Sequence, residues 1–219
     1  MRIGCLHTAE SNIAVFEAAL REIELDRVAL RHSVRSDLLV AAERAGGLTP
    51  EIAKRTAEAL RSLCEEGTDA VLLTCSTLGP VVSQEMKTGL SPFAAIPVLR
   101  VDAALAETAV RDGGRVVALC AVETTLRPTQ ALFESAAQAT GAEIEVRLIP
   151  GAWNLFKAGE HDGYLDAIAA AADSAFRDGA KAVALAQASM AGAARRCRAG
   201  MPLSSPTAGL KAAATLLPR

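Results

Sequence analysis

The stretch that decides the fold is Gly67-Thr-Asp-Ala-Val-Leu-Leu-Thr-Cys75-Ser-Thr-Leu-Gly-Pro80, because the chain repeats its pattern as Gly179-Ala-Lys-Ala-Val-Ala-Leu-Ala-Gln187-Ala-Ser-Met-Ala-Gly192. Each copy begins with a helix-ending glycine and continues through a short polar turn, a five-residue apolar strand and a loop of small residues. Cys75 and Gln187 occupy the same position, 112 residues apart (187 − 75). The repeat predicts a chain built from two similar halves.

The elements before these stretches repeat with nearly the same offset. Short apolar runs open the two halves at Arg2–Leu6 and Arg115–Leu119 and are predicted to be strands. Apolar residues at helical spacing precede both central strands: Ile52, Thr56, Leu60 and Leu63 in the first half, Leu165, Ile168, Ala172 and Phe176 in the second.

The ends of the two halves also correspond. Each half closes with a proline, a short strand and an Ala-rich helix, from Pro97 in the first and from Pro202 in the second. Asp102 is predicted to cap the first of these helices, and Ser205 followed by Pro206 to start the second.

Strands that alternate with helices of this length predict βαβ units and parallel sheets. The expected fold is α/β, with two similar doubly wound, Rossmann-like parallel-sheet lobes related by a pseudo-twofold axis. Residues 1–99 form the first lobe, with 203–219 packing back onto it, and residues 100–202 form the second. Ligands bind beyond the carboxyl ends of strands in such sheets. The active site is therefore expected in a cleft between the lobes, with Cys75 and Gln187 facing a ligand from opposite sides.

The composition bounds the class of protein. Hydrophobic residues make up 51% of the chain and the mean hydropathy is +0.25, yet apolar runs such as Val116–Val122 are far too short to span a membrane. Met1–His7 has no apolar segment of signal-peptide length, so a cytoplasmic protein without a membrane partner is expected. The net charge of −2 without a basic block argues against nucleic-acid binding.

The sequence gives no support for a bound cofactor or metal. No Gly-rich nucleotide loop follows the first strand, and aromatic residues are only 3% of the chain, which disfavours a stacking platform for bases or flavins. The five cysteines are scattered without a CxxC motif, and the three histidines are interpreted as isolated residues that form no ligand motif with them. Neither a disulfide framework nor a metal site is expected.

Cys75 is the candidate for catalysis. It lies just after the strand Val71–Thr74, in a small polar loop where backbone N–H groups at a helix start can lower the pKa of a thiol and make it a base or nucleophile. The structural alternative is a partly buried, inert thiol, since free cysteine is among the most buried residue types.

Hydroxyl side chains also gather at predicted strand ends. Together with helix N-termini they can hold a carboxylate and stabilise charge that develops on it. For each one taken alone, helix capping is the simpler role. The candidate substrate-binding hydroxyls are those of Ser76, Thr77, Thr124, Thr125 and Ser189.

His7 ends the first strand and is a candidate for orienting a substrate or tuning a thiol, against the alternative of a structural histidine. Cys120 holds nearly the same position in the second half, where core packing is the simpler expectation. Glu123 and His161 are acid–base candidates by residue type only. The remaining cysteines, Cys5, Cys64 and Cys197, are expected to be structural.

These residues resemble the aspartate/glutamate/hydantoin racemase superfamily over nearly the whole chain. The resemblance rests first on Thr74-Cys75-Ser76-Thr77 after one strand and a small-residue loop after its counterpart. Supporting segments are Pro97-Val-Leu-Arg-Val-Asp102, Val117–Thr125, Val183–Ala191 and Pro202–Leu217. The segments His7-Thr8, Gly46-Gly-Leu-Thr-Pro50 and Ala186-Gln-Ala-Ser-Met190 look like a branch that keeps only the first-lobe cysteine.

The resemblance implies cofactor-independent chemistry in amino acid metabolism, with two cysteines on opposite faces of a small carboxylate substrate. One thiolate removes the α-proton and the other thiol returns one, and a homodimer is compatible with the family. In this chain Gln187 replaces the second cysteine, and an amide can donate hydrogen bonds but cannot exchange a proton at neutral pH. His7 or Cys120 as a second acid–base group, a one-base reaction, nucleophilic attack by Cys75, and lost activity all remain open.

The resulting hypothesis is a racemase or isomerase acting at the carbon next to the carboxylate of a small acid or amino acid. Cys75 is the acid–base group or nucleophile, and Gln187 and Ser189 supply hydrogen bonds. The alternatives are a lyase of the arylmalonate decarboxylase kind with a single cysteine, and a non-catalytic protein that binds a small acid.

Overall fold

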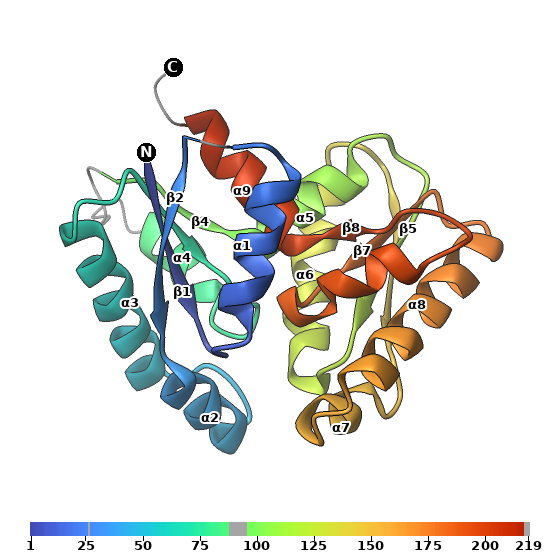
Figure 1. Cartoon of the computed structure of the whole chain (residues 1–219), viewed down its shortest axis with the longest axis horizontal. Helices are drawn as coiled ribbons and strands as arrows, with labels where there is room; N and C mark the ends of the chain where they lie inside the picture. Colours follow the sequence, from blue (N-terminus) through green and yellow to red (C-terminus); the bar gives the residue numbers. More distant parts are fainter. Residues whose placement is uncertain (26, 88–95, 217–219) are drawn as a thin grey trace. The chain divides into compact units, whose positions relative to one another are not determined.

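The computed structural model describes residues 1–25, 27–87 and 96–216 (Figure 1). The chain divides into two compact units: unit 1 comprises Met1–Ala104 and the C-terminal segment from Pro206, and unit 2 comprises Leu105–Ser205. The tail predicted to pack back onto the first lobe includes residues 217–219, which lie outside the described residues. Among the described residues, Gly209 of the tail sits against Val101 of unit 1 so closely that an added Cβ would lie 2.5 Å from Val101 Cγ1.

Unit 1 is built on a four-stranded parallel sheet in the order β2-β1-β3-β4. Its strands are β1 (Arg2–His7), β2 (Ala29–Val34), β3 (Ala70–Leu73) and β4 (Val98–Arg100), and its helices are α1 (Asn12–Glu22), α2 (Ser36–Ala45), α3 (Pro50–Glu65), α4 (Pro80–Lys87), the start of α5 (Val101–Val110) and α9 (Ser205–Leu216).

Unit 2 repeats this plan with the order β6-β5-β7-β8, again all parallel. Its strands are β5 (Arg115–Cys120), β6 (Glu143–Leu148), β7 (Ala182–Leu185) and β8 (Leu203–Ser204), and its helices after α5 are η1 (Glu123–Thr125), α6 (Leu126–Ala137), α7 (Ala152–Lys157), α8 (His161–Arg177) and η2 (Ala188–Arg196). The two sheets have matching orders, as the internal repeat predicts, and the α/β fold with two parallel sheets is confirmed.

Local sequence explains where the repeated elements begin and end. The Thr49 hydroxyl accepts the Ile52 N–H at the start of α3, and Pro50 occupies the first turn, where its missing N–H costs nothing. Gly67 and Gly179 follow α3 and α8 with φ of +74° and +90°, a left-handed conformation that favours glycine. These are the two glycines that open the repeated stretches.

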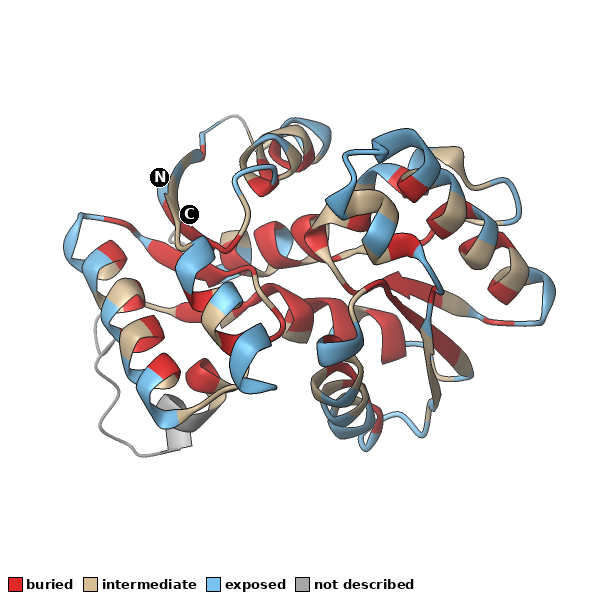
Figure 2. Cartoon of the chain, turned by 90° about the horizontal axis from the view of Figure 1, so that it is seen from below, coloured by how far each residue is buried: buried red, intermediate tan, exposed pale blue. Residues whose placement is uncertain are grey.

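Each unit has its own apolar core, and the central strands carry it. All four residues of β3 are buried, and β1 and β5 are buried beyond their first residue (Figure 2). In unit 1, Leu6 packs with α3 side chains and with Val71 and Leu73 of β3. In unit 2, Val117 and Leu119 pack with the buried face of α8. Burial on both faces of the sheets accounts for the high apolar content of the chain.

β4 passes directly into α5, and Asp102 is the second residue of that helix. Its Oδ1 accepts the Ala103 backbone N–H (3.0 Å), so the carboxylate does satisfy a donor of the first turn, although from inside the helix. Both carboxylate oxygens also accept hydrogen bonds from the Arg100 guanidinium. Ser205 does begin α9, as expected. Within the described ranges, no helix is long and apolar enough to cross a membrane.

Candidate functional site

The candidate site in unit 1 lies where β3 ends beside β1. The Thr74 N–H donates to the Leu6 carbonyl (3.1 Å), which continues the β1–β3 ladder by one residue. Cys75 follows as the second residue after β3, and the chain then turns through Ser76–Gly79 into α4. This is the carboxyl edge of a parallel sheet, where ligands bind in such folds.

The sulfur of Cys75 is surrounded by hydrogen-bond donors. The Thr8 hydroxyl, directly after β1, and the backbone N–H groups of Thr77 and Leu78 each lower the pKa of the thiol by hydrogen bonding. The Leu78 N–H also donates to the Cys75 carbonyl (3.2 Å), so it is shared between two acceptors. The side chain is partly buried and packs against the unit 1 core. These donors stabilise negative charge on the sulfur, so the position suits an atom that passes through a thiolate state.

The resting state of this thiol differs from the expectation. Burial raises the pKa of Cys75 above its usual value, and the nearby Asp102 carboxylate acts in the same direction, against the lowering effect of Thr8, Leu78 and Thr77. The helix-start environment was expected to lower the pKa, but removal of the sulfur from water outweighs the three donors. Cys75 is therefore a neutral thiol at pH 7, which makes it a proton donor before it is a base.

A buried ion pair lies under the Cys75 loop. Arg100, the last residue of β4, donates from Nε and Nη2 to the two Asp102 oxygens (3.0 and 2.8 Å) and from Nη1 to Ser83 Oγ (3.0 Å). Both side chains are less than one-tenth exposed. Gly79 gives the guanidinium its room, since a Cβ at that position would lie 2.6 Å from Arg100 Nη2. The loop that carries Cys75 therefore packs at Gly79 against a buried guanidinium, which is paired with Asp102 and bonded to the following helix at Ser83.

His7 is fully buried, and both of its ring nitrogens already have partners. Nδ1 is 2.9 Å from Thr74 Oγ1, and Nε2 is 2.9 Å from His32 Nδ1. Burial lowers the pKa of His7 to about 3, with the His32 ring adding to the effect. Its role as a substrate-binding residue stays a prediction. The contacts show a neutral imidazole that is hydrogen-bonded to Thr74, the residue before Cys75.

The equivalent loop of unit 2 is closed by hydrogen bonds. Gln187 Oε1 accepts the Ala121 N–H (2.7 Å), and Gln187 Nε2 donates to Thr125 Oγ1 (2.7 Å). The Thr125 hydroxyl in turn donates to the Val122 carbonyl (2.6 Å). The amide therefore ties the end of β7 to the loop after β5. Substrate binding by Gln187 and Thr125 stays a prediction, and it would have to compete with these internal bonds.

The other candidate hydroxyls fall in two settings. Ser76 and Thr77 are buried in the turn after Cys75, where Gly79 N–H donates to the Ser76 carbonyl (3.2 Å). Thr124 is exposed in η1, and Ser189 shares a 2.8 Å hydrogen bond with the Tyr164 hydroxyl. The structure thus brings Cys75 and Thr77 together in unit 1, and Gln187 and Thr125 together in unit 2.

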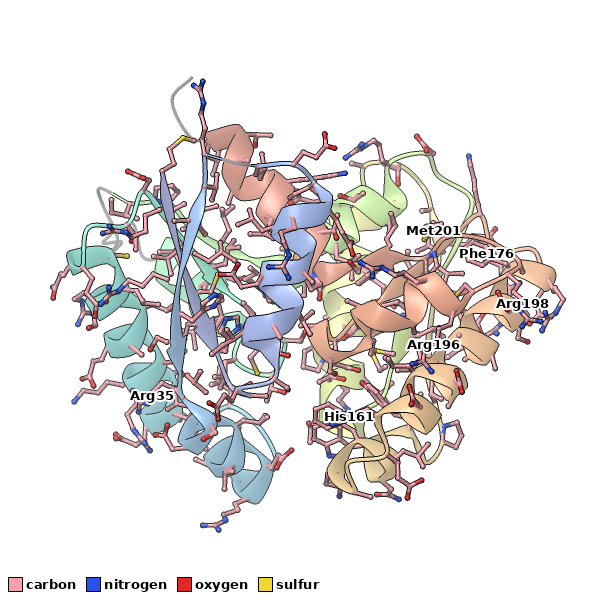
Figure 3. The ribbon with its side chains drawn as sticks, in the orientation of Figure 1. Arg35, His161, Phe176, Arg196, Arg198 and Met201 are labelled. Atoms are coloured by element: carbon pink, nitrogen blue, oxygen red, sulfur yellow. The ribbon has the colours of Figure 1, made fainter. Side chains whose placement is uncertain are left out.

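Of the remaining acid–base candidates, Cys120 lies in the core, and Glu123 and His161 are exposed. The Cys120 thiol donates to Thr129 Oγ1 (3.6 Å) and is fully buried, and burial raises its pKa. Glu123 is exposed at the start of η1. His161 is the exposed first residue of α8, the helix on which Asp162 and Asp166 pair with Arg196 of η2 (Figure 3).

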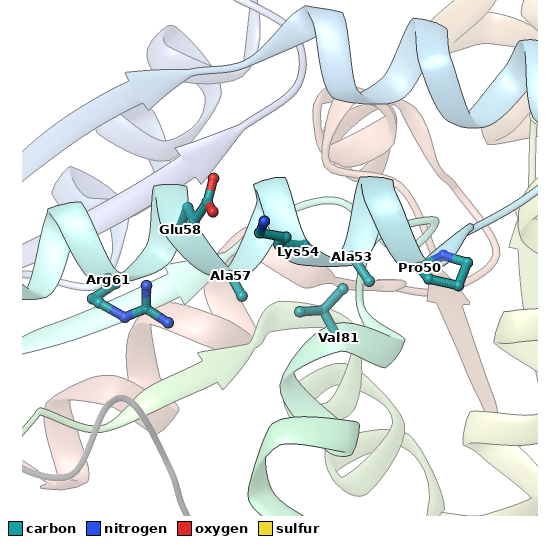
Figure 4. A pocket seen from close by; sticks show the side chains of 7 residues that line it. All are labelled: Pro50, Ala53, Lys54, Ala57, Glu58, Arg61 and Val81. Carbon is teal, nitrogen blue, oxygen red and sulfur yellow. The ribbon is translucent and has the colours of Figure 1, made fainter.

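A pocket of about 330 Å³ lies between α3 and the start of α4 in unit 1 (Figure 4). Cys75 does not line it, and its charged side chains are exposed or half-buried, so it is separate from the site built around the thiol. Its lining residues are Pro50, Ala53, Lys54, Ala57, Glu58, Arg61 and Val81.

Sequence reasoning missed the side chains that set the state of Cys75. Thr8 directly follows β1, and because neighbouring parallel strands end at one edge, its position predicts contact with the loop after β3. Arg100 and Asp102 stand two residues apart at the end of a short apolar strand, a spacing that favours an ion pair at the same edge. The position of Thr8 and the spacing of Arg100 and Asp102 could both have been recognised in the sequence.

Comparisons with known proteins support the fold. No protein-family model matches the chain, and no curated protein matches it significantly. Among solved structures, the aspartate racemase of Picrophilus torridus superposes with a TM-score of 0.70 at 13% identity, covering 97% of this chain and 94% of that one. Glutamate racemase RacE1 from Bacillus anthracis gives 0.68 at 15% identity, covering 98% and 80%.

Allantoin racemase from Pseudomonas fluorescens is similar as well, with a TM-score of 0.64 at 18% identity over 99% of this chain and 90% of that one. The chain therefore has the fold of these racemases from end to end. Identities at this level show the fold alone.

Proposed function

We propose that this protein is an enzyme in which Cys75 transfers a proton at the carbon next to the carboxylate of a small acid or amino acid, as a racemase or isomerase. The observation that carries the proposal is the donor set around the sulfur, formed by the Thr8 hydroxyl and the Thr77 and Leu78 N–H groups. A catalytic thiol alternates between thiol and thiolate. Burial favours the first state and the three donors stabilise the second.

The proton transfer follows from these surroundings. When a carbanion forms beside the bound carboxylate, the Cys75 S–H bond breaks, its proton joins the carbon, and the electron pair stays on sulfur as a thiolate. The donors from Thr8, Thr77 and Leu78 are already oriented toward that charge, so little reorganisation is needed. The reverse step, in which the thiolate removes the α-proton, uses the same contacts.

Recognition of the carboxylate is part of the same proposal. Ser76 and Thr77 lie in the turn next to the sulfur, and Thr124, Thr125, Gln187 and Ser189 remain the candidates from unit 2. The similarity to aspartate, glutamate and allantoin racemases supports a small, carboxylate-bearing or ureide-like substrate. A dimeric assembly accompanies this proposal from the sequence resemblance, and a cytoplasmic location from the composition of the chain.

A decarboxylase is the second candidate, and the state of Gln187 favours it. Racemisation needs a second group that exchanges protons, whereas Gln187 has no titratable proton and both of its amide atoms are engaged within unit 2. Loss of CO₂ from a malonate-like acid creates the carbanion without any base. A single neutral thiol such as Cys75 then suffices to protonate it.

The test begins with a screen of small mono- and dicarboxylic acids for thermal stabilisation of the protein. A ligand at 100 times its Kd raises the unfolding free energy by about 2.7 kcal/mol, which is easily detected. Each hit is then incubated with the protein in heavy water. A racemase exchanges the α-hydrogen of recovered substrate for deuterium, whereas a decarboxylase labels only its product.

Cys75→Ser is expected to lower kcat by about 10²- to 10⁴-fold, the usual contribution of a positioned acid–base group, while ligand-induced stabilisation persists. Cys197→Ser is the matched control, because Cys197 is a partly buried thiol of unit 2 with no role in the proposal. Unchanged kcat in Cys75→Ser would refute the catalytic assignment. Binding of an acid without turnover in the wild type would leave only the binding-protein alternative.

A further inference from the structure

A second cluster of reactive side chains lies on the opposite face of β1 from the α3 core. Cys5 and His7 alternate along β1 and so point to the same face, and His32 of β2 pairs with Cys5 in the parallel register. One donor atom from each of the three lies within 4.8 Å of the others. Helix α1 contacts the cluster, with Phe16 against the His7 ring at 5.1 Å and Glu17 at His32.

The hydrogen bonds fix which nitrogen of His7 carries its proton. The Thr74 hydroxyl donates to the Leu6 carbonyl (2.9 Å), so toward His7 it must accept. Nδ1 of His7 therefore holds the N–H, and the lone pair is on Nε2. This lone pair points at His32 Nδ1, 2.9 Å away.

The outer nitrogen of His32 faces an acid. His32 Nε2 lies 3.2 Å from Glu17 Oε1, an arrangement in which Nε2 donates to the carboxylate. In the neutral ring that leaves the second lone pair on Nδ1, which then faces the lone pair of His7 Nε2. Two outer N–H groups are held by acceptors and two inner nitrogens face each other beside a thiol. An ion between the inner nitrogens would satisfy both lone pairs.

We propose that Cys5, His7 and His32 form a binding site for a divalent cation of the zinc type, with Thr74 and Glu17 orienting the two imidazoles. One sulfur and two imidazole nitrogens are the donors that zinc prefers, and three protein ligands leave a fourth position open. The carboxylate–histidine–metal arrangement of Glu17 and His32 is the usual way in which a ligating histidine is oriented.

Binding of an ion requires the ligand atoms to move: the two nitrogens must separate, and the Cys5 sulfur, which lies within 4.8 Å of both, must come to about 3.6 Å from them. Metal–nitrogen bonds of about 2.0–2.1 Å and metal–sulfur bonds of about 2.3 Å place tetrahedral ligand atoms roughly 3.3–3.7 Å apart. The 2.9 Å between His7 Nε2 and His32 Nδ1 must therefore open by about half an ångström. His32 lies on the edge strand β2 and its side chain is 13% exposed, so it has room to move, whereas Cys5 and His7 are fully buried.

Access and charge are also consistent with a cation. Glu17 is 38% exposed and lies at the solvent side of His32, which gives an entry path lined by a carboxylate. Burial raises the pKa of the Cys5 thiol far above its usual value, and the Glu17 charge adds to this, so Cys5 is a thiol without an ion. On binding, the Cys5 S–H bond breaks, the proton leaves to solvent, and the thiolate pair forms the metal–sulfur bond.

The experiment is a titration of the full-length protein, stripped of metal with a chelator, with Co²⁺ and then with Zn²⁺. We expect one Co²⁺ per chain, with visible bands of a tetrahedral site and a near-ultraviolet thiolate-to-cobalt charge-transfer band, all displaced by Zn²⁺. Cys5→Ala is expected to remove the charge-transfer band. Glu17→Gln is expected to weaken Zn²⁺ binding by about 10- to 100-fold.

Matched controls come from residues of the same types outside the cluster. Cys197→Ala and His161→Ala are expected to leave every band unchanged. If circular dichroism shows that Cys5→Ala does not fold, His32→Asn on the edge strand β2 tests the proposal in its place. We expect this variant to lose the tetrahedral bands.

Absence of a charge-transfer band in the wild type, or its survival in both Cys5→Ala and His32→Asn, would overturn the proposal and leave a hydrogen-bond network. None of these readouts depends on turnover at Cys75.

Discussion

The ends of β3 and β7 hold the same place in two sheets of the same order, yet they have become chemically different. After β3, the Cys75 sulfur is met by a hydroxyl and two N–H groups that offer hydrogen bonds to it. After β7, the Gln187 amide both accepts and donates, and each of those bonds ends within unit 2. The end of β3 carries a sulfur that accepts hydrogen bonds, whereas the Gln187 side chain after β7 links the end of β7 to the loop after β5.

This difference shows how two halves can share a fold while the side chains at equivalent strand ends form different contacts. An amide satisfies one backbone N–H and one hydroxyl at once, which a thiol does poorly because sulfur is a weak hydrogen-bonding group. Gln187 therefore strengthens the junction between β5 and β7, while the junction between β1 and β3 relies on Thr74 and its bonds to Leu6 and His7.

The largest expected effect is at the ion pair beneath the Cys75 loop. Asp102→Ala leaves the buried Arg100 guanidinium without its carboxylate, and we expect a loss of about 3–5 kcal/mol in the free energy of unfolding. Glu145→Ala in unit 2 breaks ion pairs to Arg115 and Arg147 that are about one-third exposed, and should cost less than about 1 kcal/mol. Urea unfolding followed by far-ultraviolet circular dichroism measures both.

A double variant sharpens this prediction. Arg100→Met with Asp102→Leu removes both charges together, so most of the loss caused by Asp102→Ala should be recovered. Equal losses for Asp102→Ala and Glu145→Ala would mean that the Arg100 guanidinium reaches water once its carboxylate is removed. Arg100 and Asp102 would then not form a buried ion pair.

The next effect concerns Tyr164, the single tyrosine, whose hydroxyl meets Ser189 in η2. Burial raises the pKa of Tyr164 to about 12, with the Ser189 hydrogen bond acting in the opposite direction. The pKa of tyrosine in an unfolded chain is about 10, so the hydroxyl keeps its proton in both the folded and the unfolded chain below that pH. Between about pH 10 and 12 only the unfolded chain releases it, and stability should fall by up to about 1.4 kcal/mol per pH unit.

Tyrosinate absorbance reads this titration directly, first in buffer and then in urea as the unfolded reference. Tyr164→Phe lacks the ionising hydroxyl, so the difference in unfolding free energy between wild type and variant should shrink as the pH rises through this window. A folded-state midpoint equal to the one in urea would show that the hydroxyl is not buried, and that Ser189 is not held as described.

Individual residues show which parts of the structure could be predicted from the sequence. The offset between Cys75 and Gln187 predicted the two sheets, because a repeated pattern of glycine, strand and loop must pack in the same way twice. The cluster of Cys5, His7 and His32 could not be predicted from the repeat. His32 is distant from Cys5 in sequence, and only the register of β1 against β2 brings the two together. The expectation that histidines stand apart from cysteines is therefore wrong for His7 and His32.

The state of Cys75 was out of reach for a related reason. A strand-end position predicts N–H donors, but the degree of burial depends on how the core of unit 1 and the residues after β1 pack around the sulfur. Burial then decided the sign of the pKa shift. Thr125 and Gln187 were candidates by residue type and position, and the sequence had no means to show that they bond each other.

The smallest effect tests the cross-link itself. Gln187→Ala leaves the Ala121 N–H without its acceptor and Thr125 without its donor, and we expect a loss of about 1–3 kcal/mol. Gln130→Ala is the control, because Gln130 makes only an exposed pair with Glu134 on α6, worth a few tenths of a kcal/mol. Fluorescence of Trp153, the single tryptophan, follows unfolding of unit 2. If Gln187→Ala is as stable as Gln130→Ala, the amide is not a structural link, and Gln187 returns to being a free donor that a carboxylate can use.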